Sequence, residues 1–266
     1  MRDVYRALAA LEQEGRSGAL CTIVSTQGST PRHEGSKMLV YPDGSIVGTV
    51  GGGEVEGRVI QQALKVLAGE KARVLSYDLV DPTQGDPGVC GGSMDVFIEP
   101  IHSPDVLLVI GGGHVGQAVV HAGKWLGYHV ILSDDRPEFC RPEIAPEADD
   151  YLPCEIEELP SRMEFNDRTA VVLATRNMNV DTSGLPEILA VPTAYVGVIS
   201  SRRRWALTKK ELLEQGVDPA LVESVRAPVG LDLQAETPQE IAVSILAEVI
   251  MVKRGGAGAP LSENVK

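Results

Sequence analysis

The pattern of apolar and polar positions is clearest between residues 106 and 135. Five apolar residues at 106–110 predict a buried β-strand, and the glycine-rich segment 111–116 predicts a tight turn. A helical period then leads to a second, largely apolar run at 129–133. Strand, turn, helix and strand in this order predict the start of a βαβ unit in a parallel sheet.

The alternation of strands and helices continues toward the carboxyl end. The further predicted elements are strands at 148–152, 169–175 and 195–200, and helices at 180–189 and 201–215. A capping box at 237–240, with proline at the first helical position, opens a last helix that ends at Gly255. This part of the chain is predicted to be a Rossmann-like, doubly wound parallel-sheet domain.

The first hundred residues have a different pattern. The predicted strands are 20–25, 38–40, 45–50, 74–78 and 94–98, with one helix before them and one from Glu54 to Leu67. The chain is therefore predicted to be α/β, with an N-terminal α+β domain before the Rossmann-like one. A connector with two prolines separates them, and we expect domains at 1–101 and 102–256 and a flexible tail at 257–266.

Composition excludes several classes of function. The formal net charge of −13 repels phosphate backbones, and Arg202–Arg204 are the only notable basic cluster, so no nucleic-acid partner is expected. No apolar run approaches the ~18 to 20 residues that cross a bilayer, and the chain opens on an amphipathic helix. We expect a cytoplasmic protein without membrane contact. The four cysteines lack a Cys-x-x-Cys pair and suggest neither a zinc site nor a disulfide framework.

The turn after the 106–110 strand has the spacing Gly-x-Gly-x-x-Gly. Its first glycine is expected to form the tight turn, its second to admit a pyrophosphate, and its third to let the helix pack closely on the sheet. Two aspartates follow the next strand, about where an acid meets a ribose hydroxyl. The residues of this predicted dinucleotide-type site for NAD(P) are Gly111, Gly113, His114, Gly116, Asp134 and Asp135. A domain that kept the turn and binds no dinucleotide is the alternative.

Two segments of the first domain also have the composition of binding loops. A triple glycine at 51–53 places backbone N–H groups at a helix start, where an anion can bind, although Glu54 and Glu56 already complement the helix dipole there. Cys90 ends a polar loop beside two glycines, where a ligand can approach the thiol. Close backbone packing and a structural cysteine are the respective alternatives.

The order of motifs in the whole chain is specific. The motifs are Gly28–Arg32, Gly35–Val40, Gly51–Gly53 with Glu56, Cys90–Gly92, Gly111–Gly116, Ser201–Arg203, Ala227–Asp232 and Ala235–Ala242. In this order they resemble the xanthine dehydrogenase accessory proteins, the XdhC/CoxI family, over nearly the whole chain. The sequence departs from relatives that carry a cysteine at the position of Glu54, or histidines within 175–181 and at the position of Arg226. These departures argue against a histidine-based metal or acid/base site in the second domain.

The resemblance implies a non-enzymatic chaperone that binds molybdenum cofactor, supports its sulfuration with a cysteine desulfurase, and delivers it to a xanthine dehydrogenase-like molybdoenzyme. It also implies a homodimer. The cofactor is a pterin dithiolene with a phosphate tail, and the thiolate of Cys90 is a soft donor for molybdenum or sulfur. We expect the cofactor between the domains, with Cys90 facing its metal end. The predicted cofactor-binding residues are Cys90, Gly91, Gly92, Arg32, Lys37, Gly51, Gly52 and Gly53.

Two other functions fit the glycine fingerprint. One is an NAD(P)-dependent oxidoreductase, although the sequence has no obvious Tyr-x-x-x-Lys pair for hydride chemistry. The other is a dinucleotide-sensing regulatory protein whose first domain binds a partner. Thermal stabilisation by nucleotides rather than by pterins would favour the second.

Overall fold

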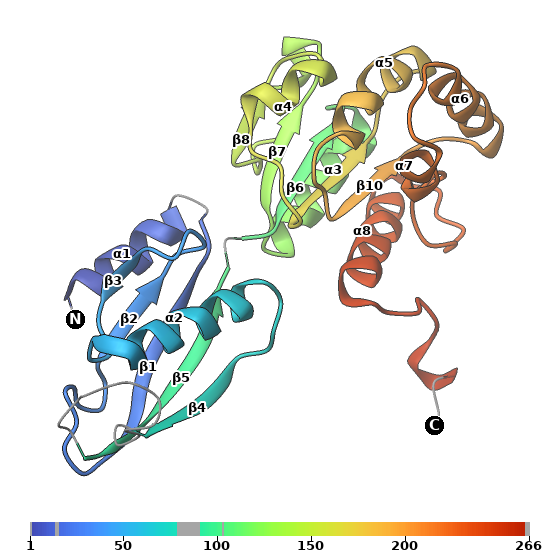
Figure 1. Ribbon diagram of the computed structural model, residues 1–266. Helices are drawn as coiled ribbons and strands as arrows, with labels where there is room; N and C mark the ends of the chain where they lie inside the picture. The colour runs from blue at the N-terminus through green and yellow to red at the C-terminus, as the bar shows by residue number, and fades with distance from the viewer. Residues whose placement is uncertain (1, 14–15, 79–90, 103, 264–266) are drawn as a thin grey trace. The chain divides into compact units, whose positions relative to one another are not determined.

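The computed structural model describes residues 2–13, 16–78, 91–102 and 104–263 (Figure 1). The chain divides into two compact units, Met1–Ser103 and Pro104–Lys266, each with its own sheet and core. Within the described ranges, no helix has the length and apolar character needed to cross a membrane.

The first unit is an antiparallel sheet between two helices. Its elements are α1 (Arg2–Gln13), β1 (Gly18–Gln27), β2 (Lys37–Val40), β3 (Ile46–Gly48), α2 (Gly53–Leu67), β4 (Arg73–Asp78) and β5 (Ser93–Ile101). The strand order is β3-β2-β1-β5-β4, with neighbouring strands antiparallel. Alternate residues of each strand face opposite sides of the sheet. Val59 and Ala63 of α2 therefore pack on Cys21 and Ile98, whereas Leu11 of α1 packs on the other face.

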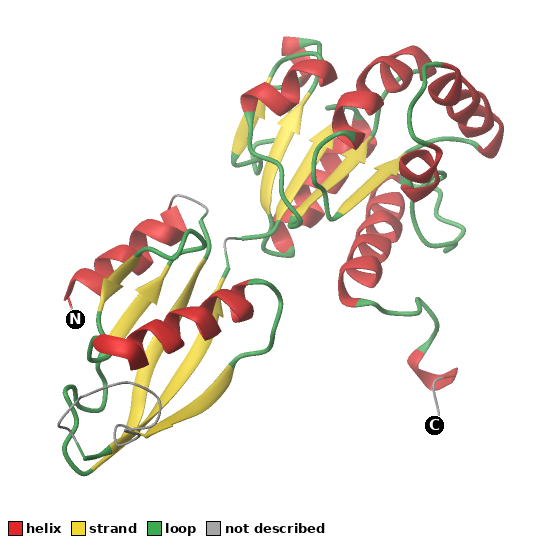
Figure 2. Ribbon diagram, in the orientation of Figure 1, coloured by secondary structure: helices red, strands yellow, loops and turns green. Residues whose placement is uncertain are grey.

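The second unit is a parallel sheet covered by helices on both faces (Figure 2). Its elements are β6 (Val106–Ile110), α3 (His114–Trp125), β7 (His129–Ser133), β8 (Asp150–Leu152), α4 (Leu159–Arg162), β9 (Thr169–Leu173), α5 (Met178–Leu189), β10 (Tyr195–Val198), α6 (Arg202–Glu214), α7 (Pro219–Ser224) and α8 (Pro238–Arg254). Short 3₁₀ helices lie at Pro137–Phe139, Ile156–Glu158 and Leu261–Glu263. The strand order is β10-β9-β6-β7-β8. This is the predicted Rossmann-like, doubly wound fold, which the structure confirms.

The strands of this sheet are buried on both faces, which explains their uninterrupted apolar runs. Leu107 and Val109 of β6 face α3 and α8, whereas Leu108 and Ile110 face α5. A buried polar contact fixes α8: Glu248 accepts hydrogen bonds from the Tyr195 hydroxyl at 2.6 Å and the Gly230 N–H at 2.8 Å.

Candidate functional site

The candidate site lies at the carboxyl edge of the parallel sheet. β6 and β9 are neighbours there although β7 and β8 separate them in sequence, so this is the topological switch point where open α/β sheets bind ligands. A crevice at this point is lined by residues that follow three strands, among them Gly111, Asp134 and Thr175. The fold thus gathers the glycine turn and the aspartate pair at one edge.

The three glycines of the turn have different surroundings. Gly111 has a φ of 115°, and a Cβ there would lie 2.5 Å from the carbonyl oxygen of Ala174. A Cβ at Gly116 would overlap the carbonyl oxygen of Gly111, because α3 begins directly against the turn. A Cβ at Gly113 would meet nothing within 4 Å in the part of the chain that the structure describes.

Gly113 is also the N-cap of α3. Among the described side chains none caps this end of the helix, and its first turn holds no acidic residue. Because the first N–H groups of a helix have no intrahelical partner and carry partial positive charge, α3 presents an open anion-binding end. His114 is the exposed first residue of the helix.

Asp134 is a structural part of the turn. Its carboxylate is 3% exposed and accepts the Gly112 N–H at 2.9 Å, together with the backbone N–H and the guanidinium of Arg136 at 3.0 Å. The oxygens predicted to accept a ribose hydroxyl therefore already have donors within the protein. The sequence offered one signal for this arrangement that we missed, an arginine two residues after the acid.

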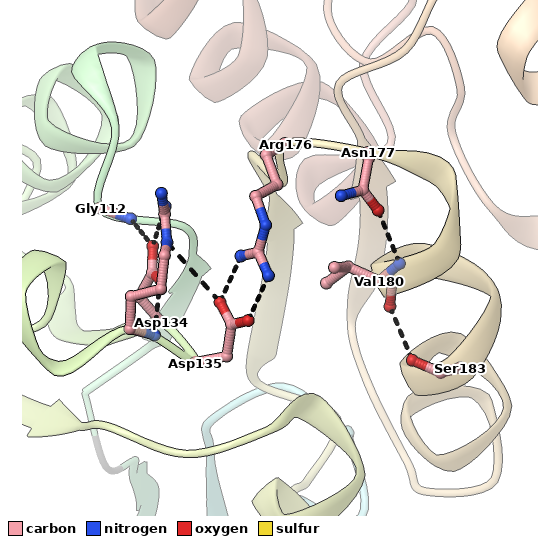
Figure 3. A network of polar contacts seen from close by, with 8 residues as sticks. Gly112, Asp134, Asp135, Arg176, Asn177, Val180 and Ser183 are labelled. Atoms are coloured by element: carbon pink, nitrogen blue, oxygen red, sulfur yellow. Dashed lines mark hydrogen bonds and ion pairs between the residues drawn. The ribbon is translucent and has the colours of Figure 1, made fainter.

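Asp135, which follows β7, pairs with an arginine that follows β9 on the far side of β6 (Figure 3). Both Nη atoms of Arg176, which follows β9, donate to the Asp135 carboxylate. These hydrogen bonds lower the pKa of Asp135 below its ordinary value. The cavity that remains in the crevice is about 20 Å³, room for about one water molecule. With this pair closed, the crevice is too small for a nucleoside.

The three arginines at 202–204 do not act as one cluster. Arg204 turns inward, and its guanidinium donates to Thr175 and to the fully buried carboxylate of Asp181. Burial raises the pKa of Asp181, although its hydrogen bonds to Thr175 and Arg204 act in the opposite direction. Arg202 and Arg203 are exposed at the start of α6. Arg204 therefore ties α5 to α6.

In the first unit, a carboxylate fills the triple-glycine turn. Glu56 Oε2 accepts the Val50 N–H at 3.1 Å, the Gly52 N–H at 3.2 Å and the hydroxyl of Thr49. The Gly51 N–H in turn donates to Thr49 Oγ1 at 3.0 Å. Three consecutive N–H groups of this turn thus have acceptors within the protein, unlike the open end of α3.

Several predicted residues of the first unit do come together. A Cβ at Gly28 would lie 3.0 Å from Gly92, and a Cβ at Gly51 would lie 2.7 Å from Pro31. The polar loop, the triple glycine and the double glycine therefore meet at one end of the antiparallel sheet.

The two charged residues predicted to bind the cofactor from this loop have different surroundings. Arg32 is exposed, whereas the ammonium of Lys37 donates to Thr22 Oγ1 at 2.9 Å. Gly53 is exposed at the start of α2, and Gly91 is exposed before β5. Cys90 lies outside the described residues.

The cysteines that the structure describes are core residues. Cys21, Cys140 and Cys154 are buried and unpaired. Burial raises the pKa of the Cys21 thiol to about 12 and also raises the pKa of the other two thiols. Among the described side chains, no group of three or more His, Cys, Asp or Glu residues is placed to hold a metal ion.

Fold and site together define a two-domain protein with a Rossmann-like carboxyl-terminal domain. A family model described as the XdhC Rossmann domain matches residues 107–249, and one described as the XdhC and CoxI family matches residues 11–78. The chain belongs to the XdhC and CoxI family, as the order of motifs predicted.

Curated relatives agree with this family. "Uncharacterized protein YqeB" of Escherichia coli is 37% identical over 96% of this chain and 47% of its own length. A protein of Bacillus subtilis described as a probable xanthine dehydrogenase subunit is 30% identical over 60% of this chain and 46% of its own length. This chain therefore aligns with about half the length of each of these two relatives.

Two further proteins are more distant in sequence. "Molybdenum cofactor insertion chaperone PaoD" of Escherichia coli is 24% identical over 95% of this chain and 88% of its own length. A crystal structure of a protein described as a xanthine dehydrogenase from Bacillus halodurans has a TM-score of 0.51 at 21% identity, covering 97% of this chain and 98% of its own. At that identity the structural likeness shows a shared fold.

Proposed function

We propose that this chain is an accessory factor for a xanthine dehydrogenase-like molybdoenzyme, binding molybdenum cofactor, supporting its sulfuration and delivering it. The family and the name of the PaoD relative support the cofactor as cargo. The observation that carries the proposal is the open N-terminus of α3 at the switch point. A phosphate tail is the part of the cofactor that such an end binds.

The glycine turns of the two domains are not equivalent for this purpose. The N–H groups at 50–52 are already bonded to Glu56 and Thr49, so we assign the phosphate to the turn that ends at Gly113. On the sequence argument, Cys90 is the residue that would bind molybdenum as a soft ligand or carry sulfur supplied by a cysteine desulfurase.

The test is retention of molybdenum cofactor, released anaerobically from a molybdoenzyme, on gel filtration with this protein. Gly113→Asp adds an N-cap carboxylate to α3, which favours the helix but repels a phosphate. We expect the parent to retain molybdenum and Gly113→Asp to lose it at an unchanged or higher melting temperature. Thr237→Asp, which adds the same charge at the N-cap of α8, is the matched control and is expected to bind.

Failure of the parent to retain the cofactor would contradict the proposal. Cys90→Ala belongs in the same series, because retention and delivery of sulfurated cofactor by that variant would remove the role given to Cys90.

We also infer that a second copy of the chain docks on the outer face of α3. His114, Ala118, His121, Ala122 and Trp125 form one stripe at helical spacing, and Trp125 is 82% exposed. A groove of about 570 Å³ lies between this stripe and α8. α3 itself contains no aspartate or glutamate, and His121 of the stripe pairs with Glu147 at 2.5 Å.

The stripe is suited to two-fold symmetry. Trp125 and Ala118 are seven residues apart, which places them on one side of α3 about 10 Å from each other. A two-fold axis near His121 and Ala122 therefore brings each Trp125 onto the partner's small residues, as a closed, isologous interface requires.

A further inference from the structure

The ion pair between Asp135 and Arg176 differs from the other Arg–Asp pairs at this edge. The Asp134 side chain is 2% exposed and accepts hydrogen bonds from two backbone N–H groups, and Asp181 is fully buried. The Arg176 side chain is 42% exposed and that of Asp135 is 15% exposed. In the described part of the chain, no backbone N–H donates to Asp135, and Arg136 Nε lies 3.8 Å from it. Both side chains of this pair are more exposed than those of the Arg136–Asp134 and Arg204–Asp181 pairs, so it is the pair of the three that separates at the least cost.

The ion pair between Asp135 and Arg176 closes the crevice. Asp135 follows β7 and Arg176 follows β9, so their hydrogen bonds cross the crevice beside the glycine turn (Figure 3). The cavity beneath has about 20 Å³. A ligand that enters the crevice must therefore separate the two side chains.

We propose that Arg176 is a phosphate-binding residue whose guanidinium stays paired with Asp135 until a phosphate binds. In the free protein the guanidinium binds the carboxylate of Asp135; when an organic phosphate enters, the guanidinium turns to its oxygens, because the planar fork fits both groups equally well and a phosphate carries more charge. This inference rests on the proposed function and deepens it, since it names the side chain that completes the anion site begun by α3.

The test uses two variants that remove the same ion pair. Asp135→Asn frees Arg176 for the ligand and is expected to tighten binding about three- to tenfold. Arg176→Gln removes the donor and is expected to weaken binding about tenfold or more. A purely structural pair predicts changes in the same direction in both variants. Changes in affinity of opposite sign in the two variants therefore identify Arg176 as a binding residue.

Binding is measured anaerobically by ultrafiltration, with molybdenum cofactor quantified as retained molybdenum and with ADP as a second phosphate source. Melting temperatures show whether the two variants lose equal stability, as the loss of one shared contact requires. Arg202→Gln, at an exposed arginine that begins α6, is the control and is expected to change affinity less than about twofold.

The outcomes separate the two proposals. No retention of molybdenum by the parent overturns the proposed function. Binding by the parent with equal losses in Asp135→Asn and Arg176→Gln overturns the role of Arg176 and leaves the function standing. Opposite signs with ADP but not with the cofactor support the phosphate clamp and assign it to a nucleotide.

Discussion

At the scale of single residues, Glu56 decides what a glycine turn can do. The triple glycine and the α3 turn look similar in sequence, since each places glycines between a strand and a helix. Glu56 folds back onto its own turn and accepts two backbone N–H groups and a hydroxyl, whereas α3 has no acid in its first turn. Glu56 and Thr49 therefore occupy the N–H groups at 50–52, whereas Asp134 occupies only the Gly112 N–H of the second turn and no described side chain caps α3.

Removing this carboxylate measures how much the turn depends on it. Glu56→Ala leaves the Val50 and Gly52 N–H groups without their acceptor, and we expect the free energy of unfolding to fall by about 1.5 to 3 kcal/mol in urea denaturation. Glu54→Ala is the matched control, because Glu54 forms a surface pair with Arg58 that is worth at most about 1 kcal/mol. Equal losses in the two variants would contradict this account.

The contribution of Asp135 to stability depends on pH. Arg176 lowers the pKa of Asp135 in the folded chain, so the pair stabilises the protein above the ordinary aspartate value near 3.8. That contribution is lost as pH falls through the lower folded-state pKa. We expect the difference in unfolding free energy between the parent and Asp135→Asn to be constant above pH 5 and to shrink toward pH 2 in denaturation series. A difference that grows on acidification would refute the assignment.

At the scale of elements, the strand, glycine turn and helix around α3 act as one unit. Gly116 packs on Gly111, and Gly111 packs on the backbone after β9, so the turn is fixed from both sides. Only Gly113 among the three faces open space within the described structure. The packing explains two of the glycines and leaves open space at the third, Gly113, where the proposed phosphate would bind.

This division predicts that glycine-to-alanine substitution destabilises the protein more at Gly116 than at Gly113. Gly116→Ala forces a Cβ against the Gly111 carbonyl oxygen, and we expect a loss of about 1 to 3 kcal/mol in chemical denaturation. Gly113→Ala has space and an ordinary φ of −70°, so its cost should stay within about 1 kcal/mol. Comparable losses at the two positions would show that the turn is not packed as described.

Periodicity in the sequence predicted these elements well. The run at 106–110, the glycine turn and the second strand fixed the βαβ unit, and apolar runs located the later strands to within a few residues. Short elements such as α7, with six residues, carry too few periods to be recognised. In the site, the glycines of the α3 turn were predicted because they are close together in the sequence. The pair of Asp135 and Arg176 could not be predicted in this way, because it joins positions 41 residues apart.

At the scale of the whole molecule, the charge of the chain restricts how copies associate. An excess of 13 negative charges opposes contact between most pairs of faces. The outer side of α3 and α8 carries Trp125, Val243 and Ile250, which are 82%, 57% and 40% exposed. This exposed apolar face is where the proposed contact between copies is expected.

A charge placed on that face should prevent association. Trp125→Glu is expected to convert a dimer into a monomer, or to weaken it at least about tenfold, in sedimentation velocity, because it removes an aromatic anchor and adds a charge opposite its own copy. Leu261→Glu adds the same charge at a residue that is 88% exposed outside this face and should leave the dimer intact. A parent that sediments as a monomer at tens of micromolar would refute the interface.

The division of the chain into two units with separate cores has a further consequence for calorimetry. Cores that do not share residues need not melt together, so heat absorption by this protein is expected to resolve into two peaks rather than one. A small molecule raises the temperature only of the peak belonging to the unit that binds it. Two thermograms, one with and one without molybdenum cofactor, would thus report which half of the chain binds the proposed cargo.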